Sequence, residues 1–347
     1  MRYGIKPTAL VEHLALFTDQ VPVPMVDTLF AMLQARSIMA AVKLRVFEAM
    51  QGPGVHTVQS VAAQLSLDAP SLELLMRVLA AAGYVASKGE GYVLTHLSRK
   101  WLLSGSKTDV SATVKLCYEE INMLGNLETL IQTGKGIDFH GSIVDSEVWK
   151  TYQQSMFEIA RGAAPFLTRL LPVPPGARTL LDIAGSHGYL GAAICRKHPS
   201  LRSTVIDLPS ALPHARALAV QAGITDLVDH REGNLLEGIF PGPNDVVLLA
   251  NIVHHFGESQ IIEILTRALR AVRKGGVLAI WDAKRQLSSS PDLGADGLAL
   301  WFRLTSESRI YEEADYVRFM RAAGARDVQM KKHLLAPLMV LVHGTQG

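Results

Sequence analysis

The sequence lacks the residues that would indicate a disulfide-bonded or metal-stabilised protein. Its 347 residues include two cysteines, Cys117 and Cys195, with no CxxC pair and no Cys/His cluster at metal-binding spacing. Neither a disulfide framework nor a structural zinc site is therefore indicated. We expect both thiols to be reduced and buried, and we expect no bound metal.

Net charge of either sign is also small. Thirty-four basic and thirty-two acidic side chains leave a formal charge of +2. This is too little to bind polyanions by bulk electrostatics, so nucleic acid is not an expected partner. Hydrophobic residues make up 48% and charged residues 19%, which is typical of a folded globular protein.

Long apolar runs are missing as well. No uninterrupted apolar stretch approaches the roughly 20 residues of a membrane span. Glu12 and Asp19 interrupt the first thirty residues, unlike the apolar core of a secretory signal. We therefore expect a cytoplasmic protein with no membrane contact. At this length about two domains are expected.

The first hundred residues carry a helical pattern followed by a hairpin. Apolar residues at three- and four-residue spacing predict a helix over 35–50. Two further helices are predicted at 57–65, with Thr57 as the cap, and at about 70–82. Two short strands then flank 88–91. Helix, helix and hairpin is the order of a winged helix.

A winged helix often binds DNA through its second helix. Here that helix offers Arg77 as its one cation, beside Glu73, and is otherwise apolar. Contacts to phosphates and bases need several Lys or Arg side chains on that face. The sequence therefore favours helix packing, against a second subunit, over DNA recognition.

Residues 111–170 read as helical with an interrupting loop at 134–141. One helical face carries four large side chains, namely Trp149, Tyr152, Met156 and Phe157. Such a face is either ordinary core or the wall of a pocket for an aromatic ring. Pro172, Pro174, Pro175 and Gly176 then end the helix.

A different architecture follows these prolines. Predicted strands alternate with predicted helices; the strands are 178–183, 202–206, 228–232, 245–250 and 276–281, and the helices are 188–197, 210–221 and 258–272. This alternation predicts a doubly wound α/β sheet that binds its ligand at the carboxyl ends of the strands. A helix at 311–323 precedes strands 327–332 and 337–342, which must pair antiparallel because the link between them is too short for a crossover.

The turn after the first of these strands is rich in small residues. From Asp182 the sequence is DIAGSHGYLG, in which Ser186, Gly188 and Gly191 form a degraded dinucleotide fingerprint. Asp207, at the end of the next strand, would bind a ribose in either a dinucleotide or S-adenosylmethionine. An acid directly before the turn suits an ammonium group and would repel a pyrophosphate.

Two other features favour S-adenosylmethionine. The final antiparallel strands suit a methyltransferase sheet, and His254 and His255 follow the fourth strand at the edge where a substrate would lie. Because neighbouring residues on an extended strand point in opposite directions, we expect the two imidazoles to face apart.

At this point the sequence resembles the small-molecule O-methyltransferases of plant phenolic, hydroxyindole and bacterial natural-product type. The segments LLDIAGSHGYL, TVIDLP, REGNLLEG and LLANIVHHFGES occur in the order and spacing of that family. The resemblance covers nearly the whole chain. It implies a class I methyltransferase sheet with an antiparallel last strand and an N-terminal winged-helix dimerisation domain that forms a homodimer. It also implies S-adenosylmethionine as the cofactor, with S-adenosylhomocysteine as its product.

The resemblance also implies roles for individual residues. His254 falls on the general base and Asp282 on the acid that orients it. Residues implied or predicted to bind the cofactor are Asp182, Gly185, Ser186, Gly188, Asp207, Leu208, Asn234, Leu235 and Asn251. The predicted acceptor-binding residues are Trp149, Tyr152, Met156, Phe157, His255, Trp301 and Phe302.

The sequence departs from the family at several of these positions. Ala184 and Ser186 stand where glycine is usual, and Asn234 replaces a common Asp. His255 stands where many members have Asp. Ile310 occupies the place of a second catalytic Glu, so the sequence leaves open whether His255 or Glu307 compensates for it.

These observations predict a three-part chain. Residues 1–105 would form the dimerisation domain, 106–170 a helical connector lining the acceptor pocket, and 171–347 the cofactor-binding domain. The expected reaction is methyl transfer to a hydroxyl of an aromatic or polyketide-like small molecule, with His254 as base. The alternatives are N- or C-methylation, a relative that does not methylate, and a winged-helix regulator that senses a ligand.

Overall fold

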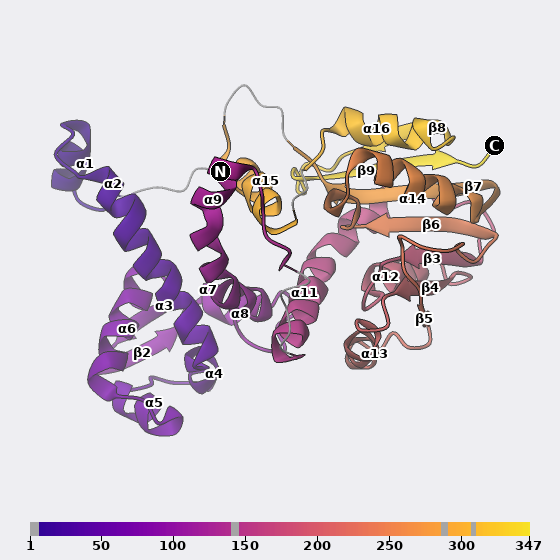
Figure 1. Ribbon diagram of the computed structural model, residues 1–347. Coiled ribbons are helices and arrows are strands. Elements are labelled where there is room, and N and C mark those ends of the chain that lie inside the picture. Colours follow the sequence, from indigo (N-terminus) through magenta and orange to yellow (C-terminus); the bar gives the residue numbers. More distant parts are fainter. Residues whose placement is uncertain (1–6, 140–145, 286–290, 307–309) are drawn as a thin grey trace. The chain divides into compact units, whose positions relative to one another are not determined.

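The computed structural model describes residues 7–139, 146–285, 291–306 and 310–347. It divides into two compact units, Met1–Asn122 and Met123–Gly347, which are treated separately below (Figure 1). Glu307 lies outside the described residues. The three-part division of the chain, with connector 106–170, stays a prediction.

The first unit opens with an exposed apolar stretch. After α1 (Leu10–Phe17), α2 (Val23–Met25), the π-helical η1 (Val26–Phe30) and α3 (Ala31–Lys43) follow without a break. The helix spanning Val23–Lys43 has a mean hydropathy of 1.3 over its most apolar window, long and apolar enough to cross a membrane by length and composition. This differs from the expectation that no stretch approaches that length, because polar residues such as Asp27 and Arg36 interrupt the apolar run in sequence but not the helix. Its large exposed side chains and those of α1 are Leu10, Val11, Leu14, Phe17, Val23, Met25, Leu29, Phe30, Met32 and Leu33.

The helix predicted over 35–50 is two helices. The break is at Arg45, whose left-handed φ of 60° ends α3 and starts α4 (Val46–Ala49). This turn lets Phe47 and Met50 enter the core of the unit beside Val42 and Met76. A single straight helix would carry those side chains to a different face.

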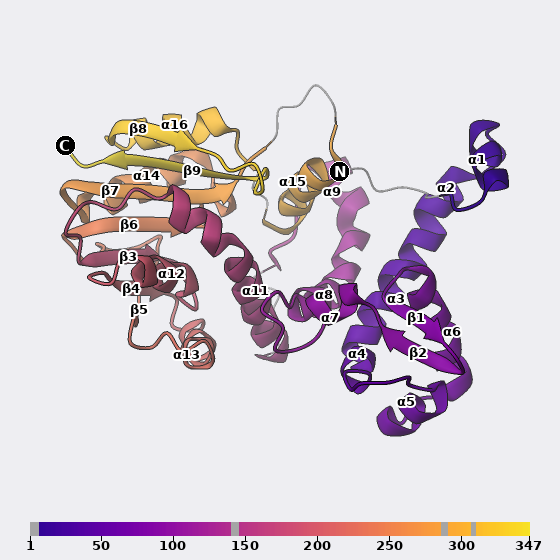
Figure 2. The same cartoon turned by 180° about the vertical axis from the view of Figure 1, so that it is seen from behind.

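The next elements follow the predicted order. In α5 (Val58–Leu65) the Thr57 side chain caps the helix by accepting a 3.2 Å hydrogen bond from the Ser60 N–H, as predicted. Helix α6 (Ala69–Ala81) leads into an antiparallel hairpin, β1 (Val85–Lys88) and β2 (Gly91–Leu94) (Figure 2). Helices α7 (His96–Trp101) and α8 (Ser111–Glu120) complete the unit. The interpretation of this group as a winged helix stays a prediction.

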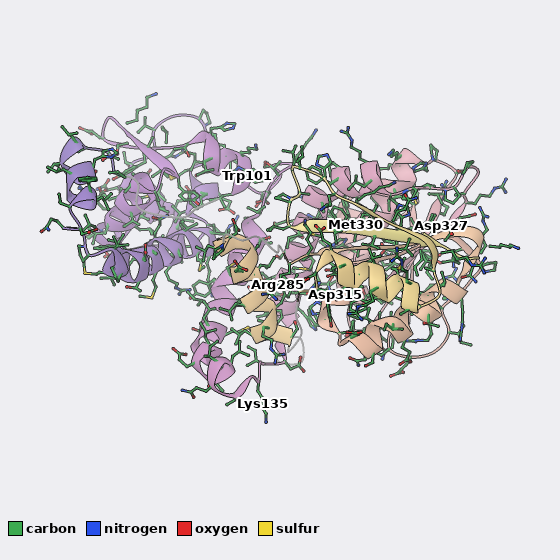
Figure 3. All side chains as sticks on the ribbon, turned by 90° about the horizontal axis from the view of Figure 1, so that it is seen from above. Trp101, Lys135, Arg285, Asp315, Asp327 and Met330 are labelled. Carbon is green, nitrogen blue, oxygen red and sulfur yellow. The ribbon has the colours of Figure 1, made fainter. Side chains whose placement is uncertain are left out.

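The second unit is built on the predicted sheet. Strands β3 (Thr179–Ile183), β4 (Arg202–Asp207), β5 (Val228–Glu232), β6 (Asn244–Ala250) and β7 (Val272–Ala283) are parallel, and β9 (Met339–Thr345) and β8 (Arg326–Lys331) close it antiparallel. The order is β5-β4-β3-β6-β7-β9-β8. This confirms a doubly wound sheet with an antiparallel last strand. Asp327 and Met330 are labelled on its edge strand in Figure 3.

Helices cover both faces of this sheet, because alternate strand residues point to opposite faces. Val247 and Leu249 of β6 pack in one cluster with α14 (Glu258–Arg270) and α16 (Glu313–Ala322). Val246 and Leu248 pack in the other with α12 (Tyr189–Lys197) and the long α11 (Ser146–Leu170). Helix α13 (Leu212–Gln221) packs beside β5.

Among the described residues, three more helices belong to the unit. Two of them precede α11 in the chain, and the third follows β7. The 3₁₀ turn η2 (Ile121–Asn126) leads into α9 (Leu127–Thr133). Helix α15 (Leu293–Ser306), which the sequence reasoning did not predict, contacts the loop after α9: the Ile137 N–H donates to the Leu304 carbonyl at 2.6 Å, and Arg303 donates to the Gly134 carbonyl.

The amino ends of three strands are joined by one carboxylate. Asp245 of β6 accepts hydrogen bonds from the backbone N–H groups of Arg178 and Thr179, at 2.7 and 3.0 Å, and pairs with Arg273 of β7. Burial alone would raise the pKa of Asp245, but the hydrogen bonds from Arg178, Arg273 and Thr179 outweigh it and hold the pKa well below its ordinary value.

We expect Asp245→Asn to lower the free energy of unfolding by about 1–3 kcal/mol at pH 7, because bonds to a charged acceptor are lost. Since the folded-state pKa is depressed, the stabilisation is complete above about pH 4 and is lost as pH falls through the folded pKa. Urea unfolding at pH 7 and pH 3 measures this. The control is Asp229→Asn, whose exposed partner is Arg231; an equal loss in both variants would contradict the assignment.

Candidate active site

The turn between β3 and α12 has an unusual backbone. Ala184, Ser186 and Gly188 have φ angles of 55°, 48° and 71°, all left-handed. Glycine adopts this region freely, whereas each of the two non-glycine residues costs about 1 kcal/mol. Ala184 and Ser186, the two departures from the family pattern, therefore keep a glycine-like backbone.

Asp182 lies directly beneath this turn. A Cβ atom on Gly185 would collide with its carboxyl group, which is why the turn needs glycine there. The side chain is 1% exposed, and within the described part of the chain neither oxygen forms a hydrogen bond of ordinary geometry. Burial, reinforced by the charge of Asp207, raises the pKa of Asp182 to about 7, although the Gly191 N–H faces it and opposes the rise.

Ser186 is held from three elements. Its N–H donates to the Asp207 Oδ2 at the end of β4, at 2.8 Å, and its carbonyl accepts from His230 Nε2 of β5, at 3.1 Å. Its hydroxyl donates to the Oε1 of Gln153 on α11. The other oxygen of Asp207 accepts from the Leu208 N–H at 2.7 Å. Asp207 thus lies beside the turn, as predicted.

Sequence reasoning missed Gln153 and His230. Gln153 is 4% exposed although it is polar. The available signal was its position one turn beyond Trp149 on the otherwise apolar helix face. No local signal marks His230, because its partner is 44 residues away in sequence.

His187 and Phe157 support the turn from within. The His187 Nδ1 accepts a 3.1 Å hydrogen bond from the Tyr189 N–H, and burial lowers the pKa of His187 to about 4. The Phe157 ring, 5% exposed, packs edge-on against His187 and Tyr189, at centroid distances of 5.3 and 5.1 Å. These contacts put Phe157 against the turn; its role in binding an acceptor stays a prediction.

The other predicted acceptor residues of α11 lie nearer its start. The rings of Trp149 and Tyr152 are 5.2 Å apart, and Tyr152 meets Phe139 edge-on at 5.7 Å. Met156 is half-buried on the same helix. An aromatic cluster therefore occupies the part of α11 next to the residues that support the turn.

A second centre lies after β6. Asn251, at φ 54°, ends the strand and donates its N–H to the Trp281 carbonyl at 2.8 Å. His254 follows in the 3₁₀ turn η3 (Val253–His255), and its Nδ1 lies 2.6 Å from the Asp282 Oδ1 at the end of β7. Asp282 also accepts from the backbone N–H groups of Val253, His254 and Ala283.

This arrangement fixes the proton on one nitrogen of His254. A carboxylate with several N–H donors acts as an acceptor, so in the neutral imidazole of His254 the Nδ1 carries the hydrogen and Nε2 has the lone pair. The imidazole is 4% exposed and lies against the Phe302 ring of α15, at a centroid distance of 4.2 Å. The predicted base, its orienting acid and one predicted acceptor residue are thus brought together.

The expected orientation of His255 is wrong. Its ring lies 4.2 Å from that of His254 at an interplanar angle of 44°, so the two imidazoles do not face apart. The reason is that they belong to a 3₁₀ turn rather than to an extended strand. The His255 Nδ1 lies 3.0 Å from the Ser306 Oγ, which the sequence did not single out. Ile310 is buried.

The remaining predicted residues occupy separate places. Asn234 folds back on its own loop, accepting from the Leu236 N–H and donating to Glu237. Leu235 packs on the hydrophobic core, Leu208 is exposed, and Trp301 is half-buried on α15. In the described ranges, no three His, Cys, Asp or Glu side chains lie close enough together to hold a metal ion.

Comparison with known proteins adds to this geometry. The model of the O-methyltransferase domain matches residues 131–326, more than half of the chain, and that of the O-methyltransferase dimerisation domain matches residues 26–104. The 3-hydroxy-5-methyl-1-naphthoate 3-O-methyltransferase of Streptomyces sahachiroi is 30% identical over 44% of this chain and 45% of its own length. The 3-O-methylredipecamine 2-O-methyltransferase of Carapichea ipecacuanha is 28% identical over 72% of this chain and 71% of its own.

Two further proteins are similar to this chain. The aclacinomycin 10-hydroxylase of Streptomyces purpurascens, named for another reaction, is 33% identical over 30% of this chain and 28% of its own. The crystal structure of human N-acetylserotonin methyltransferase in complex with S-adenosylmethionine superposes with a TM-score of 0.84 at 18% identity, over 98% of this chain and 99% of that one. That similarity shows the fold.

The buried carboxyl of Asp182 makes stability depend on pH. Because its folded-state pKa of about 7 lies above the ordinary 3.8, folding takes up a proton, and stability falls as pH rises between those values, by at most about 1.4 kcal/mol per unit. We expect Asp182→Asn to lack this decline. Between pH 5 and pH 8, the unfolding free energy of the variant should therefore rise relative to that of the wild type.

Urea unfolding without cofactor at several pH values measures the difference. Asp226→Asn, a change at an exposed aspartate, is the matched control. Parallel curves for the wild type and Asp182→Asn would contradict the raised pKa.

Proposed function

Because the chain belongs to the O-methyltransferase family, we propose that it transfers the methyl group of S-adenosylmethionine to a hydroxyl of an aromatic or polyketide-like small molecule. His254 is the general base. The observation that carries this proposal is the 2.6 Å contact between His254 and the buried Asp282 at the carboxyl edge of the sheet.

The residues around the turn fit the cofactor. Gly185 leaves the backbone open above Asp182, whose buried carboxyl group supplies a counter-charge for an ammonium group. Asp207 uses one lone pair of each oxygen on the backbone and keeps others for ribose hydroxyls. When bound, S-adenosylmethionine supplies a methyl group already activated by its sulfonium. The human relative that shares the fold is named as a complex with this cofactor.

His254 handles the proton of the acceptor. Its Nε2 accepts the proton from a phenol or similarly acidic hydroxyl, while Nδ1 stays bonded to Asp282. The carboxylate stabilises the imidazolium that forms and prevents the ring from turning. Burial of His254 and the Phe302 ring beside it exclude water from this step.

The aromatic residues support a planar acceptor. Trp149 and Tyr152 on α11, Phe302 on α15 and the neighbouring His255 offer flat apolar surfaces. The naphthoate relative is named for methylation of an aromatic hydroxyl. The relative named as a hydroxylase keeps a reaction other than methylation as the second candidate.

We also propose that the protein works as a cytoplasmic homodimer. The dimerisation-domain match includes most of the helix Val23–Lys43 with its exposed apolar residues. Arg36 and Lys43 of this helix lie over the Tyr118 ring of α8, at 4.1 and 3.7 Å. These contacts join the helix to α8 of the same unit, and the dimerisation-domain match supports subunit contact over membrane insertion.

We expect His254→Ala to cut methyl transfer to a phenol found by substrate screening about 10²–10⁴-fold, because proton removal is lost. Its affinity for S-adenosylhomocysteine should stay near that of the wild type. A second variant, His255→Ala, reports whether the second imidazole compensates for the acid absent at position 310, and His96→Ala, a change at an exposed histidine of the first unit, is the control. Unchanged turnover of His254→Ala would remove it as the base.

Cofactor binding can be tested without an acceptor. We expect calorimetry to show binding of S-adenosylhomocysteine and no binding of NAD. Asp207→Ala should weaken binding of S-adenosylhomocysteine at least tenfold. The variant loses both the hydrogen bonds to the ribose and the hydrogen bond that Asp207 accepts from the Ser186 N–H. Asp229→Ala, which changes an exposed acid on β5, should leave binding unchanged. An unaltered dissociation constant for Asp207→Ala would refute the ribose assignment.

A further inference from the structure

Ser186 links the cofactor turn to α11 by a side chain that glycine would not have. Its hydroxyl donates to Gln153, while its backbone is held by Asp207 and His230. The left-handed φ of 48° makes serine less favourable here than glycine, so the hydroxyl bond offsets part of that cost. The turn is therefore hydrogen-bonded to α11 at a residue whose backbone is left-handed.

Along α11, Gln153 lies between residues that contact the cofactor turn and residues that form the aromatic cluster. Toward the carboxyl end, Phe157 packs against His187 and Tyr189 of the turn and its helix. Toward the amino end, Trp149 and Tyr152 form the aromatic cluster with Phe139. Residues four apart on a helix share a face, so the Gln153 side chain lies next to that of Trp149.

We propose that Gln153 is a positioning residue that couples occupancy of the cofactor turn to the order of the acceptor-binding part of α11. When the cofactor fixes the turn, Ser186 fixes Gln153, and the helix segment carrying Trp149 and Tyr152 becomes more ordered. By linkage, an acceptor that orders this segment strengthens cofactor binding by the same factor. This inference rests on the proposed cofactor site.

The probe is S-adenosylhomocysteine, and the full chain is used. In the wild type we expect the ligand to slow hydrogen exchange of the backbone amides in 149–157. Gln153→Met keeps the length of the side chain but has no oxygen to accept the hydroxyl. We expect it to lose at least half of the ligand-dependent slowing, and to bind the ligand about 2- to 10-fold more weakly, the range of one hydrogen bond.

The chain offers a matched control and a second route to the same bond. Gln154→Met makes the same change at the next residue and should keep both the slowing and the affinity. Ser186→Ala removes the donor instead of the acceptor. If one bond carries the effect, the double variant Gln153→Met/Ser186→Ala should bind no more weakly than the weaker single variant.

The outcomes separate this inference from the proposed function. Full ligand-dependent slowing in Gln153→Met, or losses of affinity that multiply in the double variant, would overturn the coupling while leaving the cofactor site intact. Absence of any binding of S-adenosylhomocysteine to the wild type would instead overturn the proposed function, and the coupling with it. Loss of slowing in Gln153→Met alone, with Gln154→Met unchanged, supports the coupling.

Discussion

The buried carboxylate of Asp282 is the constraint on which the geometry around His254 depends. It lies at the end of β7 and binds three backbone N–H groups and the imidazole of His254. A buried carboxylate is costly unless its lone pairs are used, so the turn η3 must wrap around it. The same bonds that satisfy the charge therefore determine where the His254 ring lies and which nitrogen faces outward. The bonds that stabilise this corner are therefore the same bonds that orient the His254 ring.

Much of the sheet could be predicted because its signals are local. Runs of Val, Ile and Leu mark strands buried on both faces, and the short link before β9 leaves antiparallel pairing as the one solution. Helix α15 was missed because Gly294 and Gly297 weaken its helical pattern. The break at Arg45 was missed because a left-handed arginine has no sequence signature.

The site was predictable where it depends on position along a strand, and not where it depends on contacts across the fold. Asp207 follows from its place at a strand end, and Asp282 from the resemblance to the family. Gln153 and His230 meet Ser186 through separations of 33 and 44 residues, which no periodicity encodes. The orientation of His255 failed because the chain leaves the strand geometry at Asn251, four residues earlier. Ala184, Ser186 and Asn251, all left-handed, lie at this edge of the sheet, and strained backbone of this kind is typical of functional sites.

The two ends of strand β7 take part in two separate polar clusters. Arg273, near its start, pairs with Asp245, whereas Asp282, nine residues later, orients His254. In the register of β6 and β7, Asp245 lies six residues before the level of Asp282, so at about 3.3 Å per residue the two carboxylates are roughly 20 Å apart. At this separation, and because Asp245 is paired with Arg273 while Asp282 is hydrogen-bonded to His254, the charges at one end have little influence on those at the other. Substitutions at the amino ends of the strands can thus change the tolerance of the protein to heat or acid and leave the arrangement of His254 and Asp282 at the carboxyl ends unchanged.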